Sequence, residues 1–319
     1  MPILSPLKPF FEGILASSDL RDERPVAEAR AANHIMIDSS FCPFFTQYPP
    51  LPYERDFDIP VAGGEITVRV YSPVGSPAQT GARLPCHLYF HGGGFWLGTL
   101  DQSNAGCRGL AADANCVVVS VGYRLAPEHK FPTAPEDAYA ALLWVVDHAE
   151  ELGIDASRIS VGGGSAGGNL AAVVALMARD RHGPAIVFQV LEIAVTDLTY
   201  TEPLRIDGLV VSFAGKEQYR AHYLSDISEA SNPYASPLLA PDLTGLPPAL
   251  VMCAEYDPHR IEAEAYVKKL TAAGVAVEYR CWEGQFHGSQ QLSALIPDEA
   301  AAYLAQIVSA LKRAYGVSQ

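Results

Sequence analysis

Short runs of apolar, often β-branched residues alternate with stretches of helical periodicity from about residue 65 to the end of the chain. Continuous apolar strands separated by helices form a mostly parallel sheet that helices cover on both faces, so this alternation constrains the fold more than any other feature. The candidate strands are 66–72, 86–90, 116–123, 158–163, 186–193, 248–255 and 275–282. The candidate helices are 135–151, 166–181, 260–273 and 298–314. The sequence therefore predicts an α/β fold.

Two stretches interrupt this alternation, residues 1–50 and residues 195–235. The first lacks strand-like runs and is rich in Phe, Pro and Tyr, and the second carries helix-like sequence and aromatic residues between two candidate strands. We expect them to fold together as a helical cap, with 1–50 as its N-terminal part and 195–235 as its second part. The main domain then consists of residues 51–194 and 236–319. An N-terminal tail with an ordinary insertion is the alternative interpretation.

The composition restricts the class of protein. With 319 residues, 49% of them hydrophobic, the chain can bury a large core. A net charge of −14 argues against nucleic acid or an anionic membrane as the partner. The six cysteines are scattered without a CxxC or Cys/His cluster, so we expect neither a disulfide framework nor a zinc site. The N-terminus lacks a basic signal-peptide region and no run reaches about 18 apolar residues, so we expect a cytoplasmic protein without a membrane span.

A serine stands among glycines in Gly163-Gly164-Ser165-Ala166-Gly167. A G-x-S-x-G match arises by chance in about one chain in ten of this length, so its context decides its meaning. Here a candidate strand precedes it and a candidate helix follows. A sharp strand-to-helix turn strains the corner residue and requires small neighbours, and it exposes the serine hydroxyl at the edge of the sheet. A flexible linker would lack these apolar flanks, and a phosphate loop would need a Lys-Ser/Thr pair. A tight turn with a spectator serine remains the alternative.

A second glycine cluster, His91 to Phe95, follows the candidate strand 86–90. Acyl transfer needs amide donors aimed at the oxygen that becomes negative in the tetrahedral intermediate. The amide of Ala166, at a helix N-terminus, can supply one donor, and an HGGG segment after an earlier strand can supply others. A plain glycine turn is the alternative. We interpret His91 as a residue that braces the loop rather than as a base.

Nine histidines compete for the role of general base. In a sheet of this kind the chain order is nucleophile, acid and base, and His287 follows the last candidate strand, on the same sheet edge as Ser165. His259 also follows Ser165, but we expect it to start a helix that points away. For the acid we favour Asp257, which follows a strand 30 residues before His287. Asp197 is the rival, and a helix N-cap is the alternative role for Asp257.

Taken together, these segments resemble the hormone-sensitive-lipase family of α/β-hydrolases, from about residue 60 to the end. The motifs that carry the resemblance are YFHGGGF (89–95), YRLAPEHKFPTAPEDAY (123–139), GGSAGG (163–168), NPYASPLLAPDLTGLPPALV (232–251), AEYDP (254–258) and FHG (286–288). The resemblance implies a capped α/β-hydrolase with a mostly parallel eight-stranded sheet. It also implies hydrolysis of carboxylic esters, mostly short-chain acyl or aryl esters, without a metal or organic cofactor.

The family's functional residues map onto matching positions of this chain. The resemblance implies a catalytic triad of Ser165, Asp257 and His287. It implies oxyanion donors at the amides of Gly93, Gly94 and Ala166. We expect Phe95 and Trp96 to line an apolar substrate pocket or to belong to the core, and Gly164 to flank the pocket. The partner is then a small-molecule ester, and the resemblance suggests a homodimer through the last strand and helix.

The chain departs from the family pattern at several positions. Gly164 occupies the variable place of the elbow, which usually holds Asp or Thr. The family commonly reads DPLRDE after the acid, whereas this chain has His259 and Ile261, and we expect the loss of the second aspartate to loosen the local loop network. Ser289 replaces a frequent Phe after the base.

Other functions for the same fold stay open at this point. A non-catalytic binder of this fold would lack the histidine, and His287 argues against it. An amidase, lactonase, carbamate hydrolase or acyltransferase would use the same triad, and the sequence does not separate these from an esterase. A lipase acting at lipid surfaces is disfavoured by the acidic charge and by the lack of a basic amphipathic segment.

Overall fold

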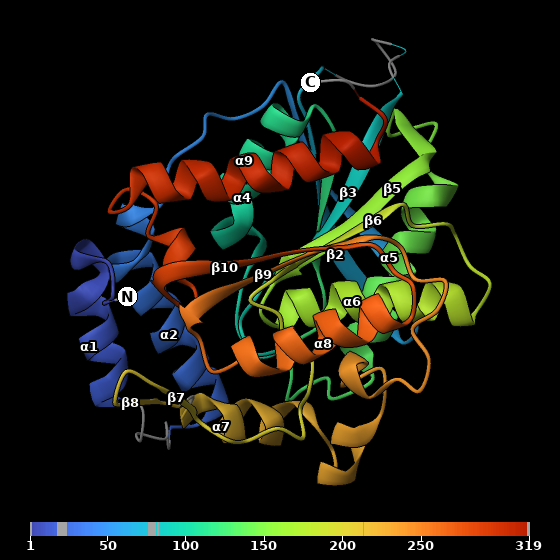
Figure 1. Ribbon diagram of the computed structural model, residues 1–319. Helices are drawn as coiled ribbons and strands as arrows, with labels where there is room; N and C mark the ends of the chain where they lie inside the picture. The colour runs from blue at the N-terminus through green and yellow to red at the C-terminus, as the bar shows by residue number, and fades with distance from the viewer. Residues whose placement is uncertain (1, 18–23, 76–80, 82, 213, 318–319) are drawn as a thin grey trace.

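The computed structural model of this chain describes residues 2–17, 24–75, 81, 83–212 and 214–317, and an eight-stranded sheet forms its centre (Figure 1). The strands of this sheet are β1 (Tyr53–Val61), β2 (Gly64–Ser72), β3 (Leu84–Phe90), β4 (Val117–Gly122), β5 (Ile154–Gly164), β6 (Phe188–Glu192), β9 (Ala249–Tyr256) and β10 (Val277–Phe286). Their order is β1-β2-β4-β3-β5-β6-β9-β10. β2 runs antiparallel to β1 and β4, and the other neighbouring pairs are parallel. The predicted α/β fold with a mostly parallel eight-stranded sheet is confirmed.

Helices cover both faces of the sheet. These helices are α4 (Leu100–Ala114), α5 (Thr133–Asp147), α6 (Ala166–Asp180), α8 (Arg260–Ala272) and α9 (Pro297–Ala314). α4 and α9 lie on one face, and α5, α6 and α8 lie on the other (Figure 1). Along β4, Val118 packs with α4 and α9, whereas Val119 and Val121 belong to the opposite cluster. A strand buried on both faces produces this period of two. No helix within the described ranges combines the length and apolarity that crossing a membrane requires.

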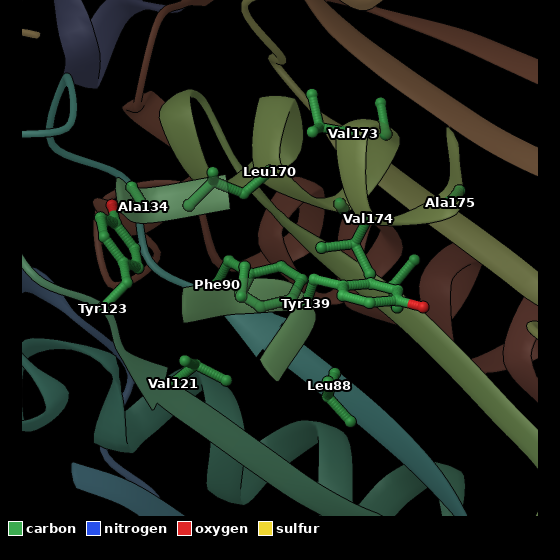
Figure 2. Packing of buried hydrophobic residues seen from close by; sticks show 14 of the residues in the cluster. Leu88, Phe90, Val121, Tyr123, Ala134, Tyr139, Leu170, Val173, Val174 and Ala175 are labelled. Atoms are coloured by element: carbon green, nitrogen blue, oxygen red, sulfur yellow. The ribbon is translucent and has the colours of Figure 1, made fainter. Parts of the chain in front are cut away.

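The helix that follows the candidate nucleophile is packed on all sides. Every residue of α6 from Ala166 to Ala178 is buried. Figure 2 shows Leu170 and Val174 of α6 facing Leu88 and Phe90 of β3, within one buried cluster. A helix that is apolar all round belongs in a core. The start of α6 is therefore held rigidly against the end of β3.

Further elements lie outside the sheet layers. They are α1 (Lys8–Ser17), α2 (Val26–Ser40), β7 (Leu204–Ile206), β8 (Leu209–Val211) and α7 (Ala214–Tyr223). Short 3-10 helices are η1 (Ser5–Leu7), η2 (Cys42–Phe44), η3 (Ile227–Ser231), η4 (Pro237–Leu239) and η5 (Ser289–Gln291). Leu7 and Phe11 share a buried cluster with Leu204 and Val211 of the β7–β8 hairpin, and these elements lie together beside the sheet (Figure 1). The two stretches predicted to form a cap thus contact each other, while their division from the main domain stays a prediction.

Two elements of the sheet layers were not predicted from the sequence. β1 is an edge strand in which Arg55, Asp56 and Asp58 interrupt the apolar pattern. α4 contains two glycines and has little apolar periodicity, yet Thr99 caps its start by accepting a hydrogen bond from the Gln102 amide. Polar pairing and capping define both elements, so an apolar pattern alone does not reveal them.

The parallel arrangement brings four loops to one edge of the sheet. β3 leads into the HGGGF segment, β5 into Ser165, β9 into Asp257 and β10 into His287. Because the carboxyl ends of parallel strands meet at one edge, residues from distant parts of the sequence converge there. This edge carries the candidate active site.

Candidate active site

Ser165 occupies a strained corner between β5 and α6. Its backbone has φ 57° and ψ −116°, a combination that non-glycine residues rarely adopt. A Cβ on Gly163 or Gly167 would collide with the Phe90 carbonyl oxygen, which is why small residues flank the corner. Ser165 itself is half-buried while Gly163 and Ala166 are buried, so the turn presents the serine at the protein surface.

Ser165, His287 and Asp257 form a continuous chain of hydrogen bonds. His287 Nε2 lies 3.0 Å from Ser165 Oγ, and His287 Nδ1 lies 2.8 Å from Asp257 Oδ2. A carboxylate only accepts, so Nδ1 carries the hydrogen and Nε2 is left to accept a proton from the serine. Asp257 has no exposed surface, whereas the His287 side chain is 16% exposed and can meet a ligand.

The Asp257 carboxylate is held in its ionised form. Burial alone would raise the pKa of Asp257, but the charge of His287 and hydrogen bonds from His287 and the His259 amide outweigh burial and lower that pKa. Asp257 Oδ1 accepts the His259 amide at 2.8 Å while Oδ2 accepts from His287. One carboxylate therefore serves both the helix start and the histidine, so the two alternative roles predicted for Asp257 coexist.

The structure separates the two candidate acids. Asp197 uses Oδ1 to accept hydrogen bonds from the amide and hydroxyl of Thr199, at 2.8 Å and 2.6 Å, so its side chain is committed to a local turn. Asp257, by contrast, is brought to His287. The geometry thus favours Asp257 as the partner of His287.

One expectation about His259 is wrong. His259 does precede the first residue of α8, but its side chain does not point away from the site. Its ring lies edge-on to the His287 ring, with centroids 5.3 Å apart, and it is 1% exposed. The buried carboxylate of Glu262 one turn further along α8 draws the ring inward, because His259 Nδ1 and Glu262 Oε1 are 2.8 Å apart.

The HGGGF segment forms a tight turn against Ser165. Gly93 has φ 119° and Gly94 φ 58°, values that suit glycine. A Cβ on Gly93 would collide with the Leu97 carbonyl oxygen, and a Cβ on Gly92 would lie 3.5 Å from Ser165 Cβ. The amide of Ala166 is at the first position of α6, where no intrahelical acceptor exists. The Gly93, Gly94 and Ala166 amides thus belong to two segments that meet at the serine, and their role as oxyanion donors stays a prediction.

His91 is placed to brace this loop. Its Nδ1 lies 2.8 Å from the Gly92 carbonyl oxygen, and its ring stacks on Tyr123 with centroids 4.3 Å apart. The Tyr123 hydroxyl donates to the His91 carbonyl oxygen at 2.8 Å. Burial lowers the pKa of His91 to about 4, although the Gly92 contact opposes the shift. His91 is therefore neutral near pH 7 and packs as part of the loop.

The predicted pocket residues Phe95 and Trp96 pack against α7. Phe95 has no exposed surface and stacks on Tyr223 with a centroid separation of 3.8 Å. Trp96 is 7% exposed, and the centroid of its ring lies 4.9 Å from that of the His222 ring. Gly164 is half-buried and has nothing within 4 Å of an added Cβ. That these three residues line or flank a substrate pocket stays a prediction.

A second serine–histidine pair lies in the core. Ser160 Oγ is 2.8 Å from His87 Nδ1, and the two residues are 0% and 1% exposed. Burial lowers the pKa of His87 to about 3, so it is neutral. Ser160 also bonds Tyr315, which ties the C-terminal helix to β5. Because a substrate cannot reach it, we interpret this pair as structural.

Sequence reasoning missed several residues around the site. Lys216 and Tyr219 of α7 and Glu262 of α8 were not singled out, and all three are buried. Lys216 pairs with Glu262, and Tyr219 packs near Gly94. The only sequence signal was the departure DPHRIE, which placed a histidine beside the acid.

Comparisons with known proteins agree with this fold. A family model described as alpha/beta hydrolase fold matches residues 87–291. The carboxylic ester hydrolase LipN of Mycobacterium tuberculosis is 42% identical over 266 residues, which cover 81% of this chain and 69% of LipN. An arylesterase of Saccharolobus solfataricus is 40% identical over 234 residues, 71% of this chain and 73% of the relative. The solved esterase of Pyrobaculum calidifontis superposes with a TM-score of 0.84 at 37% identity, covering 98% of this chain and 99% of that one.

Proposed function

The chain belongs to the α/β-hydrolase-fold family as a carboxylic ester hydrolase, and we propose that it cleaves short-chain acyl or aryl esters through an acyl-enzyme on Ser165. One observation carries the assignment of the nucleophile. On the strained corner after β5, Ser165 Oγ lies 3.0 Å from His287, and His287 lies 2.8 Å from the ionised Asp257. Nucleophile, base and orienting carboxylate are thus within hydrogen-bond reach in the required order.

Acylation follows from this geometry. His287 Nε2 accepts the proton of Ser165 Oγ as the oxygen attacks the ester carbonyl carbon, and Asp257 stabilises the imidazolium that forms. The negative oxygen of the tetrahedral intermediate accepts hydrogen bonds from the proposed donors, the Gly93, Gly94 and Ala166 amides. His287 then gives its proton to the leaving alcohol or phenol. The acyl group stays on Ser165.

Deacylation repeats the sequence with water as the nucleophile. His287 accepts a proton from water as the oxygen attacks the acyl carbon, and it returns the proton to Ser165 Oγ when the acid leaves. Every proton transfer runs through the one histidine. We therefore propose that the cycle is completed by the triad and the three amides.

The predicted cap is part of this proposal. Arg30 of α2 donates to the carbonyl oxygens of Trp96 and Ala126, at 2.9 Å and 2.8 Å. Tyr219 of α7 lies close to Gly94, because a Cβ added to Gly94 would be 3.0 Å from the Cβ of Tyr219. Both predicted cap stretches thus contact the loop that carries the proposed oxyanion donors. This supports a role for residues 1–50 and 195–235 in shaping the substrate site.

The homodimer suggested by the family resemblance also stays a proposal. β10 is an edge strand of the eight-stranded sheet, and Glu278, Tyr279 and Arg280 on it are exposed. An open edge can pair with a second copy. Sedimentation at several protein concentrations measures the oligomeric state, and a monomer at all of them would contradict the proposal.

The test of function compares wild type, Ser165→Ala and Ser160→Ala on p-nitrophenyl acetate, butyrate, octanoate and palmitate. We expect rapid release of p-nitrophenol from the short esters, a fall in kcat of about 10⁶ in Ser165→Ala, and retention of activity in Ser160→Ala. Activity that survives in Ser165→Ala but not in Ser160→Ala would overturn the assignment of the nucleophile. Absence of turnover of any ester by the wild type would instead favour a non-catalytic binder.

A further inference from the structure

His259 contacts both the acid and the base of the proposed triad. Its amide donates to Asp257 Oδ1 at 2.8 Å, and its ring meets the His287 ring at an interplanar angle of 63°. It is 1% exposed, so the contact is fixed by packing. A buried ring against the face or edge of His287 limits how that base can rotate about its side-chain bonds.

A buried carboxylate fixes the orientation of His259. Glu262 Oε1 lies 2.8 Å from His259 Nδ1 and accepts the Thr196 amide at 3.1 Å. Because the carboxylate only accepts, His259 donates its Nδ1 hydrogen to Glu262. The loop after β6, which contains Thr196, and the start of α8 are joined through this one side chain.

The charge of Glu262 is balanced from α7. Lys216 Nζ lies 3.2 Å from Glu262 Oε2, with the two side chains 9% and 1% exposed. A buried carboxylate is strongly unfavourable unless it is paired. Lys216 also lies over the Tyr200 ring, 5.5 Å from its centroid. Formation of the buried pair therefore requires α7 to be docked on the main domain.

The same helix reaches the other side of the active site. Tyr219, three residues after Lys216 on one helical face, packs near Gly94 and is 5% exposed. α7 thus contacts the glycine loop through Tyr219 and the first turn of α8, just after the acid, through Lys216.

We propose that His259 is a positioning residue for His287, oriented by Glu262, and that Lys216 completes this arrangement only when α7 is docked. This inference rests on the proposed function, since it assumes that His287 is the base. On this proposal, α7 helps to set the orientation of His287 in addition to packing against the glycine loop. In the departure DPHRIE, Ile261 stands where the family has its second aspartate and His259 stands where it has leucine. His259 then holds the loop, contrary to the loosening expected from the sequence.

The electrostatics give this arrangement a signature. The cluster is a chain of pairs, in which Asp257 bonds His287, His259 bonds Glu262 and Glu262 bonds Lys216, while Tyr219 lies within reach of the charges of Glu262 and Asp257. Glu262→Gln leaves the Lys216 ammonium without its buried partner, and Lys216→Met leaves the Glu262 carboxylate without its own. Either variant therefore disturbs the side chain that orients His259, whereas the double variant removes both buried charges.

The experiment measures kcat and KM of p-nitrophenyl butyrate hydrolysis for His259→Phe, Glu262→Gln, Lys216→Met and the Glu262→Gln/Lys216→Met double variant. We expect His259→Phe to lower kcat about 10-fold or more with KM nearly unchanged, because the base is less well oriented. We expect kcat to fall in both single variants of the buried pair, with KM nearly unchanged, and to recover toward wild type in the double variant. Glu264→Gln and Lys268→Met, which change a half-buried and an exposed side chain of α8, are the matched controls and should leave kcat and KM unchanged.

Several outcomes would overturn the inference. An unchanged kcat in folded His259→Phe would do so, as would a kcat in the double variant that is no higher than in either single variant. If a single variant fails to fold, the inference is tested by the kcat values of the double variant and of His259→Phe, compared with wild type. Neither of these variants leaves an unpaired buried charge. If Ser165→Ala retains full activity, the proposed function itself has failed, which is a different result.

Discussion

The Asp257 carboxylate and the His287 ring share a 2.8 Å hydrogen bond at a position where Asp257 has no exposed surface. The second carboxylate oxygen accepts the His259 amide at 2.8 Å, so both oxygens are fixed. A carboxylate held in this way sets the tautomer of the histidine, because Nδ1 must carry the hydrogen. The reactive nitrogen of His287 is thereby kept facing Ser165.

The first prediction concerns the identity of the acid. Asp257→Asn should lower kcat about 10⁴-fold, because an amide can donate to Nδ1 and stabilise the wrong tautomer. Asp197→Asn is the matched control and should stay within a few-fold of wild type, since the side chain of Asp197 bonds Thr199 in a local turn. Steady-state kinetics on p-nitrophenyl butyrate measure both. Near-normal activity in Asp257→Asn together with loss of activity in Asp197→Asn would show that Asp197, and not Asp257, is the catalytic acid.

The second prediction concerns the glycines of the elbow. Gly163→Ala should lower the stability by about 1–3 kcal/mol, because its Cβ would collide with the Phe90 carbonyl oxygen. Gly164→Thr should leave the melting temperature nearly unchanged, since nothing lies within 4 Å of a Cβ there. We expect Gly164→Thr to alter the relative kcat/KM for acetate and octanoate esters instead. Thermal unfolding and an ester chain-length series distinguish these effects, and equal destabilisation by both substitutions would contradict the prediction.

Much of the fold could be predicted because its signals are local. The strands β4 and β9 are largely apolar runs in which nearly every residue is buried, so the local sequence reveals their positions. Ser165 and the HGGGF segment were found because backbone strain and close approach demand glycines at fixed spacing. A few consecutive residues are enough to reveal these requirements.

The remaining features depend on contacts between distant segments. Arg30 meets Trp96 and Glu128 across more than sixty residues, and Lys216 meets Glu262 across 46. No short pattern encodes a pair of this kind, since the two residues become neighbours only after the helices pack. The orientation of His259 was mispredicted for the same reason. Its ring turns inward because Glu262 is buried, and the burial of Glu262 is a consequence of the tertiary structure.

The third prediction concerns the clamp that Arg30 makes from α2. Arg30 binds Glu128 through two hydrogen bonds of 2.9 Å and 2.7 Å and also holds the Trp96 and Ala126 carbonyl oxygens. Glu128 is 50% exposed, so the ion pair alone adds little stability, and the value of the contact is in fixing the loop. We expect Arg30→Met to lower kcat/KM about 10-fold with a small change in melting temperature.

The control for Arg30→Met is Lys8→Met. Lys8 pairs with Glu12 on α1 at 3.8 Å, and both side chains are more than half exposed. This variant removes a positive charge from the same N-terminal stretch without touching the Trp96 loop. Equal kinetic effects of the two substitutions would show that net charge, rather than the clamp, is responsible.

The last prediction concerns the buried carboxyl group of Glu192 at the end of β6. Burial raises the pKa of Glu192 from 4.5 to about 7, and the Tyr303 hydroxyl offsets this only in part. Between these two values Glu192 binds more protons in the folded protein than in the unfolded chain, so its contribution to the free energy of unfolding falls as the pH rises from about 4.5 to about 7 and is constant above. The difference corresponds to about 3 kcal/mol as an upper estimate.

Glu192→Gln removes the charge without changing the shape of the side chain. We expect it to raise the free energy of unfolding at pH 8 by up to about 3 kcal/mol and to have little effect at pH 4.5. Urea unfolding at a series of pH values measures the difference, with the exposed Glu151→Gln as the control. A stability difference that does not change between pH 4.5 and 8 would mean that Glu192 keeps its ordinary pKa in the folded protein. In that case the group would be charged at neutral pH, and the packing around Tyr303 would have to stabilise an ionised carboxylate.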